Sequence, residues 1–155
     1  MFRKILFCTD LSENSRHAFT YALSLARTYR GELLILHVMP EPLYVYQDGS
    51  SYVPVGKLEE IETSEKEKVH RELNTSYVQE MDGFKDYTVL LKRGVAFYEI
   101  IQVAKEEPVD LIVMGTHGRT GLDHILFGST AERVVRKSPI PVLTVRLPGK
   151  KFIMP

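Results

Sequence analysis

Residues 5–38 read ILFCTDLSENSRHAFTYALSLARTYRGELLILHV, and this stretch decides the fold class. It opens with an apolar run at 5–8 and closes with a second one at 33–38. Short continuous apolar runs of this kind are typical of strands that are buried on both faces. Between the two runs, apolar residues recur at helical spacing. The stretch therefore predicts a strand, a helix and a second strand, the repeating unit of a parallel sheet.

The predicted helix of this unit has recognisable ends. Asp10 or Ser12 can cap its N-terminus, and Glu13 falls in the first turn, where the helix dipole favours a negative charge. The apolar positions continue to Tyr29, and we expect Gly31 to stop the helix. The helix thus fills the interval between the two strands.

The rest of the chain repeats this alternation. The patterning predicts helices over 58–81, 95–105 and 129–137, and strands over 87–91, 109–114 and 141–146. Five strands alternating with four helices predict an α/β fold, a single open, doubly wound, five-stranded parallel sheet with helices on both faces. We expect one domain over residues 1–155.

A variable loop is expected at residues 40–56, where prolines and a DGSS run interrupt the pattern. The loop carries three tyrosines, Tyr44, Tyr46 and Tyr52. Two interpretations stay open: the rings pack the loop onto the domain, or the loop forms a lid or a partner-binding surface.

Composition narrows the class of protein. The 155 residues are 44% apolar, which is enough for a core without disulfides or a structural metal. The 20 basic and 20 acidic side chains balance, so no electrostatic footprint for nucleic acid or an anionic membrane is present. No apolar stretch approaches the roughly 18 residues needed to span a bilayer. A single cysteine, Cys8, indicates a reducing compartment, and we expect a soluble cytoplasmic protein.

The fold class predicts where a ligand binds. In doubly wound sheets, ligands lie outside the carboxyl ends of the strands, where the strand order reverses. The loop after the first strand, residues 9–12, contains no glycine, which argues against a dinucleotide-binding fingerprint. No G-x-x-x-x-G-K-[ST] sequence occurs either, so the chain is not a Walker-type NTPase.

The loop after the fourth strand is different. Residues 114–130 read MGTHGRTGLDHILFGST. Gly115 and Gly118 can take positive φ, so that successive amides turn toward an anion. Gly128, Ser129 and Thr130 open a helix, whose first amides and dipole also attract negative charge. Two sets of backbone donors around one crevice suit a polyphosphate, and Arg119 adds a mobile cation.

A purely structural interpretation of this loop stays open. Ser129 and Glu132 have the spacing of a capping box, which needs no ligand. Gly115 and Gly118 could simply permit a tight turn.

At this loop the sequence resembles the universal stress protein family. The ATP-binding branch of that family carries G-x2-G-x9-G-[ST], and Gly115, Gly118, Gly128 and Ser129 fit it without a gap. The resemblance extends over the whole chain and is weakest at 40–56. It implies the strand order 3-2-1-4-5 of the adenine nucleotide alpha hydrolase-like fold, and a nucleotide site between the first and fourth strands.

The resemblance also implies roles for individual residues. Asp10, with Thr9 beside it, would lie near the nucleoside, Val38 would offer backbone to the adenine, and Met114 would line the base or ribose pocket. The phosphates would lie against the residues Gly115, Gly118, Gly128, Ser129 and Thr130, with Arg119 nearby. Magnesium would bind through the phosphates. Homodimers would pair through the last strand, residues Val142–Val145.

Several other polar residues have simpler explanations. His117, His124 and Asp123 match no strong zinc pattern. His37, at the end of the second strand, is expected to be a satisfied buried histidine. The cations Arg133, Arg136 and Lys137 suit the C-terminal pole of their helix.

Three functions remain at this stage. The first is an ATP-binding stress-response or signalling protein in which the nucleotide modulates dimer or partner contacts. The second is a slow ATPase or phosphotransferase, for which Asp10 is the one nearby carboxylate. The third is a nucleotide-free interaction module. We favour the first and expect no catalytic residues.

Overall fold

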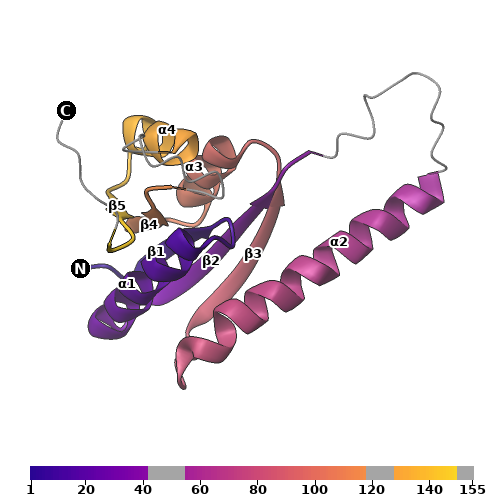
Figure 1. Cartoon of the computed structure of the whole chain (residues 1–155). Coiled ribbons are helices and arrows are strands. Elements are labelled where there is room, and N and C mark those ends of the chain that lie inside the picture. The colour runs from indigo at the N-terminus through magenta and orange to yellow at the C-terminus, as the bar shows by residue number, and fades with distance from the viewer. Residues whose placement is uncertain (42–54, 118–127, 150–155) are drawn as a thin grey trace.

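A parallel five-stranded sheet forms the centre of the computed structural model, which describes residues 1–41, 55–117 and 128–149. Its strands are β1 (Lys4–Thr9), β2 (Glu32–Met39), β3 (Tyr87–Arg93), β4 (Leu111–Gly115) and β5 (Val142–Val145). They follow the order β3-β2-β1-β4-β5, all parallel (Figure 1). The predicted α/β fold and strand order are confirmed, and the order reverses between β1 and β4.

Helices cover the two faces of the sheet. The helices are α1 (Glu13–Tyr29), α2 (Val55–Ser76), α3 (Ala96–Glu106) and α4 (Ser129–Lys137), with a 3-10 turn η2 (Val78–Met81) after α2. In Figure 1, α3 and α4 lie together on one face and α1 lies on the other. This places the helices as predicted.

The alternation of side chains along β1 explains the two cores. Ile5 and Phe7 belong to the cluster under α1, whereas Leu6 and Cys8 belong to the cluster under α3 and α4. All four side chains are buried, because β1 has a strand on each side and a helix layer on each face. The continuous apolar run that predicted this strand is thus a consequence of its central position.

The ends of α1 show one confirmed prediction and one correction. Ser12, rather than Asp10, is the N-cap, and its Oγ accepts from the amide of Ser15 at 3.3 Å. The helix ends at Tyr29, but Arg30 adopts the left-handed conformation (φ 51°) in place of Gly31. A Cβ on Gly31 would lie 2.6 Å from the carbonyl oxygen of Phe2. Gly31 is therefore needed for a close approach of two backbones.

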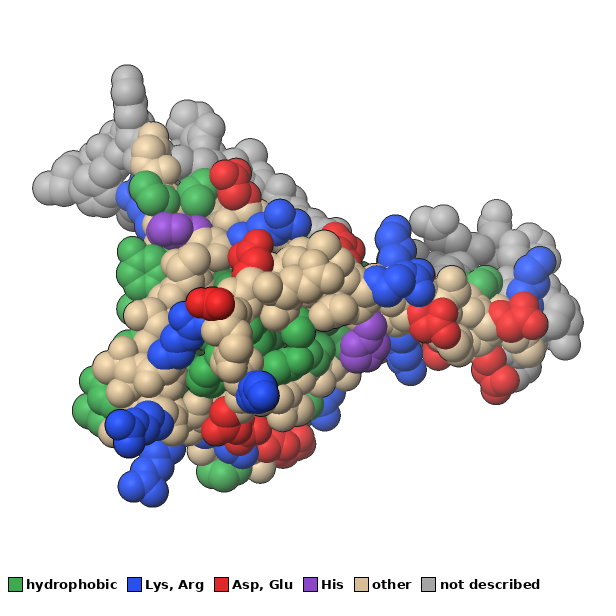
Figure 2. Space-filling model, turned by 90° about the horizontal axis from the view of Figure 1, so that it is seen from below, with side chains coloured by type: hydrophobic (Ala, Val, Ile, Leu, Met, Phe, Trp, Pro, Cys, Tyr) green, Lys and Arg blue, Asp and Glu red, His purple; other side chains and the backbone are tan. Residues whose placement is uncertain are grey.

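Helix α2 differs from the single helix predicted over 58–81. The α-helix ends at Ser76, and the chain turns into η2 after Tyr77 (φ −132°, ψ −52°). Leu73, Tyr77 and Met81 enter the core under α1, and Glu65 pairs with Arg93 at the end of β3 at 3.0 Å, but the part of α2 before Glu65 projects away from the sheet (Figure 1). Figure 2 shows acidic and basic side chains side by side along this projecting part.

The predicted loop at 40–56 ends earlier than expected, because α2 already begins at Val55. The tyrosines Tyr44, Tyr46 and Tyr52 lie outside the described residues. Within the described part of the chain, no helix is long and apolar enough to cross a membrane.

Asp110 fastens the start of β1 to the turn before β4. Its carboxylate accepts from the amides of Lys4, at 2.9 Å, and Arg3, at 2.7 Å. These two backbone hydrogen bonds hold the pKa of Asp110 below its ordinary value. Because the pKa is lower in the folded than in the unfolded protein, the stabilisation is present above the unfolded pKa of about 4 and is lost as pH falls through the folded pKa.

We expect Asp110→Asn to lower the free energy of unfolding at pH 7, with a difference from wild type that shrinks as the pH falls below about 4. Urea unfolding at both pH values measures this. Asp86→Asn, at an exposed position before β3, is the control and should change neither value. A deficit of the same size at both pH values would contradict the assignment.

Candidate functional site

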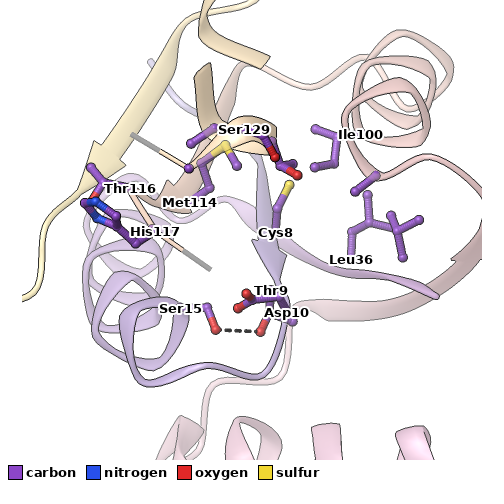
Figure 3. Close-up of a pocket in the computed structure, with 16 residues that line it drawn as sticks. Cys8, Thr9, Asp10, Ser15, Leu36, Ile100, Met114, Thr116, His117 and Ser129 are labelled. Carbon is purple, nitrogen blue, oxygen red and sulfur yellow. Dashed lines mark hydrogen bonds between the residues drawn. The ribbon is translucent and has the colours of Figure 1, made fainter. Parts of the chain in front are cut away.

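A cavity of about 260 Å³ opens where the strand order reverses, between the carboxyl ends of β1 and β4 and the start of α4 (Figure 3). The residues that line it are Cys8, Thr9, Asp10, Ser15, Leu36, Val38, Ala96, Ile100, Met114, Gly115, Thr116, His117, Gly128, Ser129, Thr130 and Ala131. Eight of the ten residues predicted for the site are among them. Gly118 and Arg119, the other two, lie outside the described residues.

The loop between β1 and α1 forms one wall of this cavity. Thr9 Oγ1 accepts from the amide of Leu11 at 2.9 Å, and Asp10 Oδ1 accepts from the amide of Ser12 at 3.1 Å. Leu11 has a φ of 66°, in the left-handed region that costs a non-glycine residue roughly 1–2 kcal/mol. The chain thus turns sharply at Leu11, and the turn leaves the Asp10 carboxylate at the cavity wall.

The second strand supplies a backbone acceptor beside this loop. The amide of Glu32 donates to the carbonyl of Arg3 beside β1, whereas the amide of Leu33 donates to the carbonyl of Asp86 before β3. Because successive residues of a strand point their backbone groups to opposite sides, the even-numbered residues of β2 direct their amide and carbonyl toward β1. Val38 is the last of these, and the β1 register ends one residue earlier. If the pairing of β1 with β2 continued, the amide of Leu11 would donate to the Val38 carbonyl. The Leu11 amide donates to Thr9 Oγ1 instead. The Val38 carbonyl therefore faces the space beyond β1.

Apolar side chains line the part of the cavity next to Val38. Leu36 and Ile100 approach it from β2 and α3, and Met114 from β4 (Figure 3). All three are less than one-tenth exposed. This part of the cavity suits a flat, largely apolar group that also carries a hydrogen-bond donor.

Gly115, at the end of β4, lines the cavity, but its backbone conformation differs from the one predicted. It does not adopt a positive φ, whereas the described glycines Gly83, Gly94 and Gly149 do. A Cβ at Gly115 would lie 3.1 Å from the carbonyl carbon of Asn14. The glycine allows the first turn of α1 to pack against the end of β4.

The N-terminus of α4 forms the opposite wall. Its N-cap is Gly128, whose amide donates to the carbonyl of Thr116 at 2.7 Å. No side chain caps the helix, so the alternative interpretation, in which Ser129 and Glu132 form a capping box, is wrong. Ser129 is the first helical residue rather than the cap, and its hydroxyl has no hydrogen-bond partner within the described part of the chain. The first-turn amides of α4 also lack helical acceptors, as at every helix start.

The remaining candidates occupy different environments. His37 is buried, and its Nδ1 lies 2.8 Å from the carbonyl oxygen of Thr9 at the end of β1. It is not among the residues that line the cavity. His117 lines the cavity next to Thr116. His124 and Asp123 lie outside the described residues, and the described ranges hold no cluster of three groups able to bind a metal.

Sequence reasoning missed several lining residues. Cys8 and Ser15 line the cavity, although neither was predicted to be a site residue. Burial raises the pKa of the Cys8 thiol, so the group is a neutral side chain at the cavity floor. Ala96 and Ile100 could not be identified from the sequence. The position of α3 beside the cavity depends on which strands are neighbours in the sheet, and no local pattern shows this.

An open, doubly wound sheet with a cavity at its switch point defines a class of α/β proteins that bind ligands at the carboxyl edge of the sheet. The chain belongs to the universal stress protein family, whose model matches residues 1–146.

Individual relatives agree with this assignment. The chain is 34% identical over 157 residues to universal stress protein MJ0577 of Methanocaldococcus jannaschii, covering 94% of this chain and 96% of that protein. It is 33% identical over 148 residues to universal stress protein YxiE of Bacillus subtilis, covering 94% and 100%.

Solved structures show the same fold. The structure of MJ0577 matches with a TM-score of 0.72 at 33% identity, covering 95% of this chain and 97% of that one. A universal stress protein solved in complex with cAMP matches with a TM-score of 0.65 at 22% identity, covering 94% and 97%. The second likeness concerns the fold alone.

Proposed function

We propose that this protein binds ATP in the cavity between β1 and β4 and acts as a cytoplasmic stress-response or signalling protein of the ATP-binding branch of its family. The observation that carries the proposal is the start of α4, where first-turn amides without a side-chain cap border the cavity together with Ser129, whose hydroxyl makes no hydrogen bond to the described residues. Such a helix start favours a phosphate group.

The other end of the cavity fits the base and the ribose. The slot formed by Leu36, Ile100 and Met114 accepts a flat ring, and the Val38 carbonyl can accept from the amino group of adenine. The Asp10 carboxylate, held by the amide of Ser12, can accept from ribose hydroxyls. These groups would orient the nucleotide with its phosphates toward α4.

The phosphate end would be completed by residues on both sides of the cavity. Gly115 at the end of β4 and Gly128, Ser129 and Thr130 at the start of α4 line the cavity, which supports this part of the proposal. As part of this proposal, Gly118 keeps the role that the family motif gives it, and Arg119 is a mobile cation near the phosphates. Magnesium would bind mainly to phosphate oxygens, which is its usual mode with nucleotides.

We propose binding and signalling rather than rapid turnover. Among the described lining residues, Asp10 carries the one carboxylate, and its position at the nucleoside wall does not suit activation of an attacking water at the phosphates. The partner surface in this proposal is a homodimer through β5. Val142, Leu143 and Thr144 on this edge strand are half-buried, and β4 is its one partner within the described sheet.

Release of bound small molecules by denaturation, followed by titration of ATP into the emptied protein, tests the proposal. We expect recovered ATP or ADP, and a dissociation constant well below millimolar that rises at least about tenfold in Asp10→Ala, since a hydrogen bond to a charged group contributes about 1.5–3 kcal/mol. Glu13→Ala, one turn away and exposed, is the control and should bind normally. A millimolar or weaker affinity in folded, emptied wild-type protein would refute the proposal.

A further inference from the structure

Three buried hydroxyl groups connect the end of α2 to the cavity wall. Tyr77 OH lies 2.5 Å from Thr9 Oγ1, and Thr9 Oγ1 donates to Ser15 Oγ at 3.0 Å. Tyr77 is completely buried, and Thr9 and Ser15 are nearly so. Thr9 and Ser15 line the cavity, whereas Tyr77 is not among the lining residues.

The direction of these hydrogen bonds follows from the number of available protons. Ser15 Oγ donates to the carbonyl of Ser12 at 2.8 Å, so it must accept from Thr9. Thr9 has one hydroxyl proton, which it gives to Ser15, and it already accepts from the amide of Leu11. Tyr77 OH also lies 3.3 Å from Ser15 Oγ, so its one proton faces two oxygens, Thr9 Oγ1 and Ser15 Oγ, and both of these residues line the cavity. Burial raises the pKa of Tyr77, which keeps the donor proton in place at neutral pH.

These hydrogen bonds connect Tyr77 to the β1–α1 loop. The Thr9 oxygen that is hydrogen-bonded to Tyr77 also accepts from the amide of Leu11, the residue with the strained positive φ. The turn at Leu11 sets the position of Asp10, and it keeps the Leu11 amide on Thr9 Oγ1 and away from the Val38 carbonyl. The Tyr77 hydroxyl thus acts on the proposed nucleoside wall through Thr9.

The ring of Tyr77 is fixed independently of its hydroxyl. It packs edge-on against Phe7 at 5.3 Å and tilted against Phe19 at 4.9 Å. Arg16 of α1 donates to Ser76 Oγ at 3.2 Å and holds the same end of α2 from outside. A change that removes only the hydroxyl will therefore leave the ring and the helix in place.

We propose that Tyr77 is a positioning residue of the nucleotide site, which couples the docking of α2 to occupation of the cavity through Thr9 and the Leu11 turn. The inference rests on the proposed binding of a nucleotide, and it adds that α2 responds to that binding. Because coupling between two sites is reciprocal, a nucleotide that holds the loop in place also strengthens the docking of α2. The projecting part of α2 is then the element of the fold that would transmit occupancy.

The test compares Tyr77→Phe with wild type in titrations with ATP and with adenosine. Loss of one neutral hydrogen bond to the wall should weaken both ligands by the same factor, about threefold to tenfold. Tyr29→Phe is the matched control, because Tyr29 packs its ring on Phe2 and its hydroxyl has no hydrogen bond within the described residues. This control should bind both ligands within twofold of wild type.

A second measurement is made on both wild-type protein and Tyr77→Phe, and its wild-type part does not depend on how the variant folds. Added ATP should slow hydrogen exchange of the amides at residues 73–77, the end of α2, and the protection should be reduced in Tyr77→Phe. Unchanged affinities for both ligands, a loss confined to ATP, or no protection at 73–77 in ATP-bound wild type would overturn the coupling while leaving the proposed function intact. Failure of wild type to bind ATP would overturn both.

Discussion

Ser129→Glu is expected to weaken ATP binding at least about thirtyfold, because a carboxylate near phosphate in a partly buried site costs about 2 kcal/mol or more. Adenosine, which lacks phosphates, should bind within a few-fold of wild type. Ser129 is exposed and stands at the first position of α4, where a negative side chain is compatible with the helix dipole. The variant should therefore remain folded, and calorimetric titration with both ligands measures the effect.

Val135→Glu provides the matched control for this prediction. It adds the same charge to the same helix at a position that is 46% exposed and does not line the cavity. We expect its affinity for ATP to stay within twofold of wild type. Equal losses of ATP affinity in both variants would indicate a general charge effect, and an equal loss of ATP and adenosine affinity in Ser129→Glu would place the phosphates elsewhere.

Gly31→Ala is expected to destabilise the fold by roughly 2–3 kcal/mol, at the upper part of the range for overpacking a close contact. The new Cβ would meet the carbonyl oxygens of Phe2 and Arg3 at 2.6 and 2.8 Å, and backbone atoms cannot move aside as a flexible side chain can. The amide of Glu32 also donates to the Arg3 carbonyl at 2.8 Å, so the clash falls on the start of the β1–β2 pairing. Urea denaturation followed by circular dichroism measures the loss.

Gly56→Ala is the corresponding control. A Cβ at Gly56 meets nothing within 4 Å, and the residue lies in α2, where alanine has the higher helix propensity. This variant should be as stable as wild type or slightly more stable. If Gly31→Ala were equally well tolerated, the close approach of residue 31 to the first strand would not exist in solution.

The fold could be predicted because its signals are local. Each buried strand is a continuous apolar run, and α1 has a regular apolar period with a serine at its start. The positions of the strands along the chain followed from these patterns. The order of the strands did not, since no local pattern decides which strands are neighbours, and the family resemblance supplied it.

The parts that could not be predicted depend on contacts between distant residues. Thr9 and Tyr77 are 68 positions apart, and nothing in the helical stripe of α2 marks one tyrosine as a hydrogen-bond donor to the first strand. Gly31 is required because the carbonyls of Phe2 and Arg3 lie against it. The sequence pattern predicted instead that Gly31 ends the helix. Similarly, Gly115 is required by Asn14 in a different element rather than by its own φ.

Ser129 shows how one pattern can support two interpretations. Its spacing to Glu132 fits a capping box, and its spacing to the upstream glycines fits a phosphate site. The structure places the cap at Gly128, one residue earlier, which leaves the serine hydroxyl without that structural role. A shift of one residue at a helix start lies within the usual uncertainty of such boundaries, yet it decides between the two interpretations.

The most direct test of the account is to map ATP onto the fold by following the backbone amide signals of the protein in NMR spectra during titration. With ATP in the cavity between β1 and β4, the largest shifts are expected at Asp10, Gly115, Ser129 and Thr130. The outer face of α4, with Arg133, Arg136 and Lys137, is the competing location for an anion. Shifts centred on these three cations, with the cavity residues unaffected, would contradict the account.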